Sequence, residues 1–438
     1  MYFYPLKLLR LLLIILIIFT FSLRSSSAIV AQSAPEKVKV LVIAYIPPDP
    51  NRPDYPDPQY VGHDLAQISI ADLKTKINNL DQQLIQVLTE GTKYKGYSNP
   101  SAQPNINYEQ VGSVVVELQP HLRSGFSAGG EAYNPDYAGI LTKANICEFV
   151  DNQSVEQVWL WGYHYGDVAP AESNMSMSNA ARAFWNRDGY GDVSNSYQYN
   201  DLSVCNHTYT LFHYNYDRGL GEAVEDHLHQ LERLFQYLDN YNQPANLPGQ
   251  SLFWNLFVGA EDGQSRLTSP GCGWTHYPPN GTQDYDWYNQ NSVQSDCMDW
   301  KPDRSGQKSL ISCSTWNGCQ ADQGVKFKIW WMQNIPGLNN GLTFRGKSLK
   351  NWWKAVYDFE GMLLEGEGLL QSNSTENQEP HDLNNDGLIN LDDFDLLVSK
   401  FGLTVEPNFT KLDIVSNGVV DIYDYNNFLE KYSELHQN

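Results

Sequence analysis

Residues 38–46 read Val-Lys-Val-Leu-Val-Ile-Ala-Tyr-Ile and are followed at once by Pro47 and Pro48. An almost continuous apolar run of this length, stopped by proline, predicts a strand that is buried on both faces of a sheet. Strands of this kind occur mainly in parallel sheets, where helices cover both faces. The run therefore favours an α/β fold, and the segments that follow it fit the same architecture.

Apolar runs and helix-like periodicity alternate along the rest of the chain. The strand-like or continuously apolar segments are 111–118, 155–163, 208–216 and 252–258. The segments with helical character are 71–89, 137–150, 221–238 and 348–364. This alternation implies parallel pairing, so we expect an α/β body with a mostly parallel sheet. Residues 262–328 lack periodicity and predict a long irregular excursion that is stapled by disulfides.

The N-terminus has the features of a signal peptide. Lys7 and Arg10 precede the apolar run 11–23, and small residues near positions 28 and 31 offer cleavage sites. The run is shorter than the ~20 residues that a membrane-spanning helix needs, so a cleaved signal is favoured over a retained anchor. We therefore expect residues 1–31 to direct export to the outside or the surface of the cell. Contact with a membrane is expected only through an uncleaved signal.

The cysteines predict disulfides, and the net charge excludes one class of partner. The cysteines are Cys147, Cys205, Cys272, Cys297, Cys313 and Cys319. An even number in an oxidising compartment permits three disulfides, and the short loop between the last two is easily closed. A zinc site is a poorer interpretation of these cysteines, because the sequence contains no close Cys-x-x-Cys pair. The formal net charge of -22 argues against nucleic acid as a partner, since phosphate binding depends on clustered Lys and Arg.

Residues 382–393 read Asp-Leu-Asn-Asn-Asp-Gly-Leu-Ile-Asn-Leu-Asp-Asp, which spaces oxygen atoms as a calcium-binding loop does. Gly387 lies at the sixth position, where the loop must turn sharply and a Cβ would clash. The expected ligands are Asp382, Asn384, Asp386, the carbonyl of Leu388, Asn390 and Asp393. The sequence therefore predicts bound Ca²⁺ in this loop.

The same pattern returns 31 residues later. The equivalent ligands are Asp413, Asn417, the carbonyl of Val419, Asp421 and Asp424. Val415 takes the third position and supplies no side-chain oxygen, so weaker binding or binding through water is expected here. Phe394, Leu397, Val398 and Phe401 recur as Tyr425, Phe428, Leu429 and Tyr432. Two loop-helix units with matched apolar positions can bury those faces against each other.

This ending, at about residues 380–434, resembles a type I dockerin. Each loop closes with Asp at its twelfth position and is followed by one helix, as in an EF-hand-like unit without its first helix. The resemblance implies an all-α calcium-binding module that attaches a secreted protein to a cohesin-like module or a surface scaffold. The pairs Leu391-Asp392 and Ile422-Tyr423 depart from the Ser-Thr pair of well-known cellulosomal dockerins. Nothing upstream shares the resemblance.

Candidate catalytic residues follow the predicted strands, because ligands of α/β sheets bind beyond the carboxyl ends of the strands. They are Glu117, His164, Glu172 and Asp217. Glycoside hydrolysis needs two carboxylates from separate loops, one protonated and one ionised, and Glu117 with Glu172 is the favoured pair. The alternative is that each caps a loop or pairs with an arginine.

The helix predicted at 221–238 carries a second candidate. Glu225 and His229 lie four residues apart and could share a metal ion, whereas His227 borders the apolar face and cannot join His229 on one ion. A solvated helix face is the favoured interpretation of these residues. No His-Glu-x-x-His signature supports a metalloprotease.

The sequence divides into a signal (1–31), a body (36–368), a polar linker (369–380) and the dockerin-like module (381–438). Twelve tryptophans and 27 tyrosines suit the stacking of sugar rings, and those in the irregular region, such as Tyr285, Trp287 and Trp300, are expected at the surface. The expected function is a carbohydrate-active hydrolase, namely a glycoside hydrolase in polysaccharide catabolism. Alternatives are a non-catalytic secreted protein that binds glycan or protein, and a metal-dependent hydrolase that uses His164, Glu225 or His229.

Overall fold

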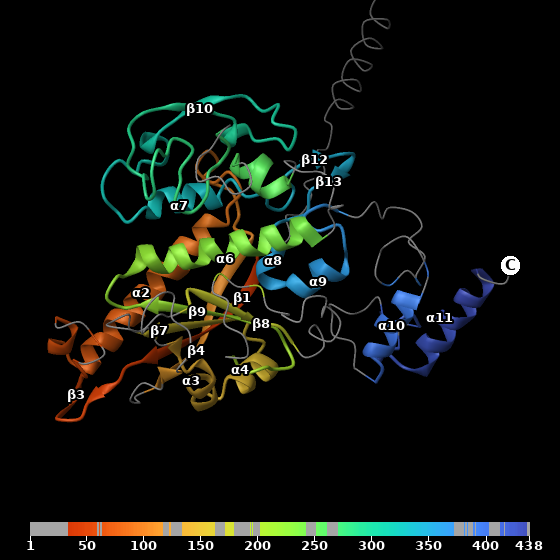
Figure 1. Ribbon diagram of the computed structural model, residues 1–438, viewed down its shortest axis with the longest axis horizontal. Coiled ribbons are helices and arrows are strands. Elements are labelled where there is room, and N and C mark those ends of the chain that lie inside the picture. Colours follow the sequence, from red (N-terminus) through yellow and green to blue (C-terminus); the bar gives the residue numbers. More distant parts are fainter. Residues whose placement is uncertain are drawn as a thin grey trace, which may run out of the picture. The chain divides into compact units, whose positions relative to one another are not determined.

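Figure 1 shows the computed structural model. It describes residues 34–435 except 59–60, 62–63, 117–121, 124–133, 163–170, 179–192, 194, 196–201, 242–250, 261–269, 372–380, 382, 384–388, 390, 403–411 and 416. The predicted signal peptide and all but the first residues of the predicted linker lie outside this part of the chain. No helix in the described part is both long enough and apolar enough to span a membrane.

The body is built on a five-stranded sheet with the order β4-β1-β7-β9-β8. The strands are β1 (Glu36–Tyr45), β4 (Ile106–Val116), β7 (Gln157–Gly162), β8 (Ser173–Ser176) and β9 (Tyr209–Asn215). β4, β1, β7 and β9 run parallel, and β8 pairs antiparallel with β9 at the edge. The α/β body with a mostly parallel sheet is thus confirmed, and the run that begins at Val38 lies in its interior with almost no exposed surface.

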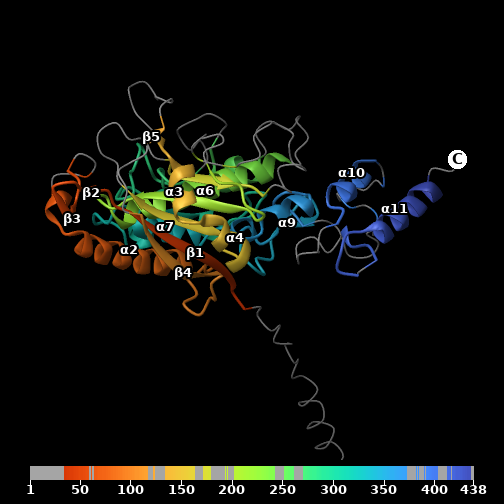
Figure 2. The same ribbon diagram turned by 90° about the horizontal axis from the view of Figure 1, so that it is seen from below.

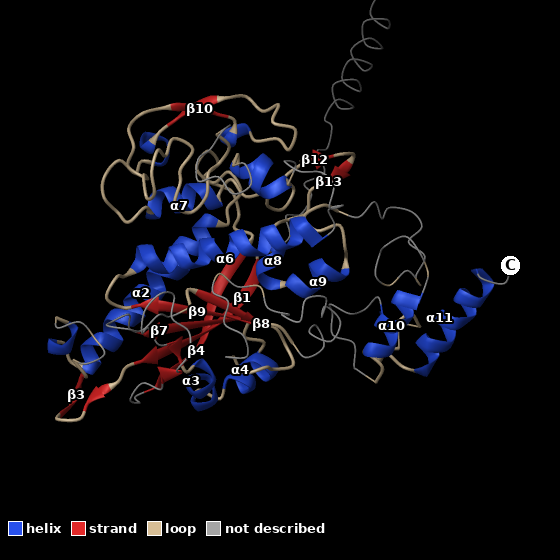
Figure 3. Ribbon diagram, viewed as in Figure 1, coloured by secondary structure: helices blue, strands red, loops and turns tan. Residues whose placement is uncertain are grey.

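Helices cover both faces of the sheet (Figure 3). α2 (Ile70–Gly91) and α6 (Leu220–Tyr241) lie on one face, and α3 (Tyr137–Lys143) and α4 (Ile146–Gln153) lie on the other. α7 (Val325–Met332) contacts α2 and α6 from outside. α6 is therefore enclosed between the sheet and the irregular excursion, which decides the surroundings of its side chains.

Three predicted elements differ from what the structure shows. The helix expected at 137–150 is two helices, because Asn145 has a left-handed backbone (φ 53°). Residues 252–258 form a π-helical turn instead of continuing the strand-like pattern, and the amide of Gly259 bonds to the carbonyl of Trp254. The helix expected at 348–364 is split by Asp358 into α8 (Lys354–Tyr357) and α9 (Phe359–Leu364). The Asp358 carboxylate caps α9 through the amide of Gly361.

The excursion from residue 270 to 324 is irregular, as predicted. Its regular pieces are β10 (Val293–Ser295), β11 (Ser309–Ile311) and the 3₁₀ turns Cys297–Asp299 and Cys313–Trp316. Three disulfides join Cys147 to Cys205, Cys272 to Cys297 and Cys313 to Cys319, which confirms the expected number. Trp287 and Trp300 are buried, so their expected surface position was wrong, whereas Tyr285 is exposed. Trp300 packs edge-on against Phe257 and Trp352 of the body, and Trp287 and Trp300 both belong to the core of the body, which is why they turn inward.

Short elements complete the body. They are β2 (Pro48–Asp49), β3 (Arg52–Pro56), the 3₁₀ turn Leu65–Gln67, β5 (Leu122–Arg123), β6 (Asn134–Pro135), β12 (Thr343–Phe344) and β13 (Lys347–Ser348). Figure 2 shows the body from below, with α3 and α4 on the near side of the sheet.

The C-terminal residues form α10 (Leu391–Ser399) and α11 (Ile422–Leu435). The two helices contact each other and enclose a small apolar cluster that includes Leu397 and Phe428. The rings of Phe394 and Tyr425, which the repeat relates, lie 4.9 Å apart between their centroids. The expected packing of the two helices is confirmed for Phe394, Leu397, Tyr425, Phe428 and Tyr432, whereas it is wrong for Val398, Phe401 and Leu429, which are exposed.

Candidate metal centre

The residues predicted to be catalytic are only partly described. Glu117 and His164 lie outside the described residues, so the Glu117–Glu172 pair stays a prediction. Asp217 is exposed in the turn after β9, where its amide donates to the side chain of Asn215. Glu172 is half-buried just before β8, and Asn195 donates a hydrogen bond to its carboxylate. The charge of Glu172 acts on Glu222, Asp226 and His229 of α6.

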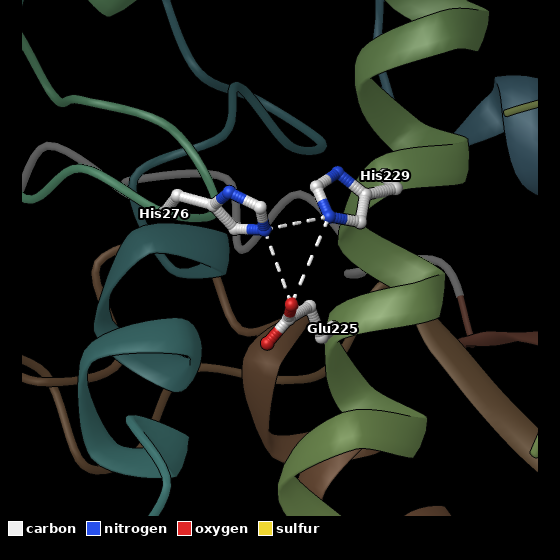
Figure 4. A group of neighbouring side chains, drawn as sticks. All are labelled: Glu225, His229 and His276. Atoms are coloured by element: carbon white, nitrogen blue, oxygen red, sulfur yellow. Dashed lines mark hydrogen bonds and ion pairs between the residues drawn. The ribbon is translucent and has the colours of Figure 1, made fainter. Parts of the chain in front are cut away.

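Three side chains of the body converge on one point: Glu225 and His229 from α6 and His276 from the excursion (Figure 4). The Nε2 atoms of the two histidines are 3.0 Å apart, and His276 Nε2 is 3.1 Å from Glu225 Oε1. His229 Nε2 is 4.0 Å from the same oxygen. Two ligands held ~2.1 Å from one tetrahedral ion lie ~3.4 Å apart, so these distances bracket the spacing that one ion requires.

Local folding explains how the three side chains meet. Glu225 and His229 are one helical turn apart and point from the same side of α6. His276 follows Thr275, whose amide and hydroxyl both donate to Glu232 of α6 and so fix this segment of the excursion against the helix. The side chains of Glu225 and His229 are only 17% and 12% exposed. The solvated helix face favoured by the sequence is therefore wrong, because the excursion covers it.

Each histidine has a carboxylate behind it. His229 Nδ1 lies 3.2 Å from Glu232 Oε2, and His276 Nδ1 lies 3.2 Å from Asp284 Oδ1. A carboxylate that accepts at Nδ1 places the proton of a neutral imidazole on that nitrogen and leaves Nε2 as a bare acceptor. Histidines that bind metals commonly donate to a carboxylate in this way from the ring nitrogen that faces away from the ion. In the neutral state, two nitrogen lone pairs and a carboxylate oxygen would face one another, which is unfavourable unless a cation lies between them.

Lys328 holds the remaining oxygen of Glu225. Its Nζ is 2.9 Å from Glu225 Oε2 and also donates to the carbonyls of Gly221 and Gln323, so its three donors are used. Burial alone would raise the pKa of Glu225, but His276 and Lys328 lower it to about 2. Glu225 is consequently ionised at neutral pH with Oε1 directed at the two histidines.

Other acidic groups around the site have pKa values displaced upward. Burial raises the pKa of Glu222 to about 7, and burial raises that of Asp226 well above its usual value. The charge of Glu172 contributes to both shifts, so its carboxylate is close to this face of α6. Burial lowers the pKa of His229, but the hydrogen bond and charge of Glu232 outweigh it and leave a net increase. The centre therefore lies among crowded acidic groups whose ionisation is disfavoured by burial and by one another's charge.

His227 takes no part in this centre, as the sequence predicted. Its ring stacks on Phe212 with centroids 3.9 Å apart, and its Nε2 is 2.6 Å from the hydroxyl of Tyr214. Burial lowers the pKa of His227 to about 3. His227 is thus a neutral core residue between α6 and the sheet.

The predicted calcium ligands of the first loop lie mostly outside the described residues. These are Asp382, Asn384, Asp386, Leu388 and Asn390. Asp393 is described: it is buried and accepts a hydrogen bond from the amide of Leu383. Neither observation tests whether this loop binds Ca²⁺.

The second loop is described at all its predicted ligands, Asp413, Asn417, Val419, Asp421 and Asp424. Asp413 accepts from the amides of Asn417 and Gly418, and the loop turns at Gly418 with φ 88°. The buried carboxylate of Asp424 accepts from the amides of Val415 and Asp421. The loop is thus wrapped around two carboxylates by backbone donors.

Sequence reasoning found Glu225 and His229 through their spacing but missed His276. His276 lies in a segment without periodicity, 47 residues from His229, and no local motif marks it. Comparison of the chain with protein-family models, with curated proteins and with solved structures found no match. The chemistry of the centre therefore has to be argued from its own atoms.

Proposed function

We propose that the body is a metal-dependent hydrolase whose ion is held by Glu225, His229 and His276. One observation carries the proposal: three acceptor atoms converge while the other nitrogen of each histidine faces a carboxylate. Imidazole and carboxylate ligands in a four-coordinate arrangement suit Zn²⁺. Calcium and magnesium fit less well, because they prefer an all-oxygen shell.

Three protein ligands leave a fourth position for water. A bound zinc ion would lower the pKa of that water and polarise a carbonyl oxygen of the substrate. Glu172 is our candidate to accept the proton of the water, because its charge acts on this face of α6. Lys328 is unsuited to this role, since its donors are already occupied. The arrangement favours hydrolysis of an acyl bond, in an ester or an amide, because such a bond offers a carbonyl for polarisation.

Two predictions from the sequence complete the proposal. We infer an exported protein whose C-terminal module binds Ca²⁺ and attaches it, in the manner of a dockerin, to a cohesin-like module or a surface scaffold. The amide-wrapped carboxylates of Asp413 and Asp424 support this inference. The proposed substrate is an acyl group carried by a polysaccharide. Such a substrate is consistent both with a dockerin-like module and with hydrolysis of an acyl bond in the body.

A second candidate is the glycoside hydrolase expected from the sequence. It is supported by Glu222, whose pKa is raised to about 7 by burial while the charge of Glu172 acts on it. A carboxyl group with a raised pKa beside another carboxylate is what acid-base cleavage of a glycosidic bond uses. In this alternative Glu222 would donate the proton, and the ion would be dispensable.

The test uses the full chain in three states: stripped with a chelator, reloaded with Ca²⁺ alone, and reloaded with Ca²⁺ and Zn²⁺. Acetate release and reducing-sugar release from acetylated xylan are measured in each state. We expect one tightly bound zinc per chain and acetate release only with zinc. Full activity with Ca²⁺ alone would contradict the metal proposal, and sugar release under that condition would support the glycoside hydrolase.

A further inference from the structure

We propose that Tyr285 is a catalytic residue that donates a hydrogen bond from its hydroxyl to the substrate oxygen at the metal centre. This inference rests on the proposed function and assigns to the same site the group that stabilises the negative charge of the reaction. Tyr285 belongs to the excursion and follows Asp284, the carboxylate behind His276. The sequence predicted only that Tyr285, as an aromatic residue of the irregular region, lies at the surface.

The position of Tyr285 is fixed from several sides. Its amide donates to the carbonyl of His276 at 3.0 Å, and its ring centroid lies 4.3 Å from that of His276. The Trp287 ring packs edge-on at 5.2 Å. Burial and the charges of Glu225, Asp284 and Glu172 raise the pKa of its hydroxyl to about 12. The Tyr285 ring therefore lies against the ring of His276, and its hydroxyl lies within the electrostatic influence of the acidic groups of the centre.

The backbone of Tyr285 has a positive φ of 60°, which a bulky residue adopts only at an energetic cost. Glycine or asparagine would take this conformation more readily. The tyrosine side chain is accordingly held in a strained position next to the centre. Strain of this kind is common at functional sites, where the surrounding contacts maintain it.

Tyr285 is also open to solvent. It is 47% exposed, and among the described residues of the body it is the one aromatic residue in the exposed class. A purely structural tyrosine would bury its ring, as Tyr137, Tyr209 and Tyr214 do. A ring that is partly exposed and packs against the His276 ring is placed to meet an incoming substrate.

The chemistry follows from this position. Water attacks the acyl carbon, the carbonyl π electrons move to oxygen, and Glu172 accepts the proton of the water. Tyr285 donates a hydrogen bond to the resulting oxyanion, and a tyrosine hydroxyl remains a donor at neutral pH. When the bond to the leaving oxygen or nitrogen breaks, the oxyanion electrons re-form the carbonyl and Glu172 returns the proton to the leaving group. Tyr285 forms no covalent bond and ends unchanged.

The test compares Tyr285→Phe with Tyr277→Phe in the full chain loaded with Ca²⁺ and Zn²⁺. Tyr277 is the matched control, since its ring stacks on Trp274 in the same excursion, 4.4 Å between centroids. Acetohydroxamate is the probe, because it binds zinc and presents an oxygen where the oxyanion would form. We expect Tyr285→Phe to bind acetohydroxamate about 10-fold more weakly by calorimetry, with zinc affinity within about 3-fold of the parent and Tyr277→Phe unchanged.

The hydrolysis of 4-nitrophenyl acetate gives a second readout. Loss of an oxyanion donor should lower kcat about 100-fold and change KM little. Acetohydroxamate affinity within about 3-fold of the parent, or a parallel loss of zinc affinity, would overturn the role of Tyr285. Failure of the parent chain to bind zinc would instead overturn the proposed function, so the two failures are distinguishable.

Discussion

Acidic side chains gather in two places, around α6 of the body and in the loop 413–424 of the C-terminal module, and they are held in opposite ways. Around α6, Glu225 pairs with Lys328 and His276, and Glu232 pairs with His229. In the C-terminal loop, the carboxylates of Asp413 and Asp424 accept hydrogen bonds from backbone amides. The first arrangement is built by packed side chains that come from distant parts of the chain. The second is built by one short segment that wraps around its own carboxylates.

The difference shows which parts of each site exist before an ion binds. The centre on α6 has its positions set by the helix, the excursion and a buried lysine, so an ion adds little order. The C-terminal module has only a small apolar core, so an ion at its loops should contribute a larger share of its stability. Each of the following predictions tests one side of this comparison.

The largest expected effect is on zinc binding. The substitution His276→Ala removes one of the three proposed zinc ligands. We therefore expect zinc affinity, measured by calorimetric titration, to fall by more than about 100-fold. The helix and sheet should keep their far-UV circular dichroism, because His276 is not part of the core. His207→Ala is the control, since His207 is exposed and outside the centre. Equal zinc affinity in both variants would contradict the assignment.

The next effect is on the stability of the body. Lys328→Met leaves the buried Glu225 without its cation, and breaking a buried pair costs about 3 kcal/mol. Chemical denaturation should show this loss in the zinc-free protein. The matched control is Lys326→Met on the same helix, because Lys326 is exposed. A loss of similar size in the control would mean that Lys328 is not specifically required.

In the C-terminal module the expected effect is on calcium affinity. Asp386→Ala removes a predicted ligand and should weaken calcium binding about 10-fold, with a lower thermal midpoint for the transition that Ca²⁺ shifts. Val415→Ala should leave both unchanged, because Val415 offers no side-chain oxygen. Equal effects of the two substitutions would count against the assignment of the loop.

The smallest effect concerns Asp81, a buried acid of the body that lacks a cation. Its Oδ1 accepts from Trp161 Nε1 at 2.6 Å, and burial raises its pKa to about 7. The folded chain therefore keeps this proton up to higher pH than the unfolded chain, whose carboxyl titrates near 3.8. Its contribution to stability is complete below pH ~4 and is lost as the pH rises towards ~7.

Asp81→Asn keeps an acceptor for Trp161 and removes this titration. We expect the variant to be about 1 kcal/mol more stable than the parent at pH 8, because the amide needs no proton to stay neutral. At pH 4 the two proteins should unfold at nearly the same denaturant concentration. A pH profile of stability that is unchanged by the substitution would show that Asp81 is not the group responsible.

Much of the fold could be predicted from the sequence, because β1 is an almost continuous apolar run and α6 has strong helical periodicity. The break at Asn145 and the π-helical turn at 252–258 could not, since both depend on local backbone conformation that periodicity does not encode. Only part of the centre could be predicted, because the four-residue spacing of Glu225 and His229 is visible along one helix. His276 and Tyr285 come from a segment whose path is set by a disulfide and tertiary contacts, so their positions could not be read from spacing.

The disulfide between Cys272 and Cys297 closes a ring of chain that contains His276, Asp284 and Tyr285. A ring with a separation of 25 residues removes about 3.5 kcal/mol of chain entropy from the unfolded state. If the excursion opens locally, the ring keeps these three side chains within a short radius of one another. Closing of the excursion would then return His276 to α6 together with Asp284 and Tyr285.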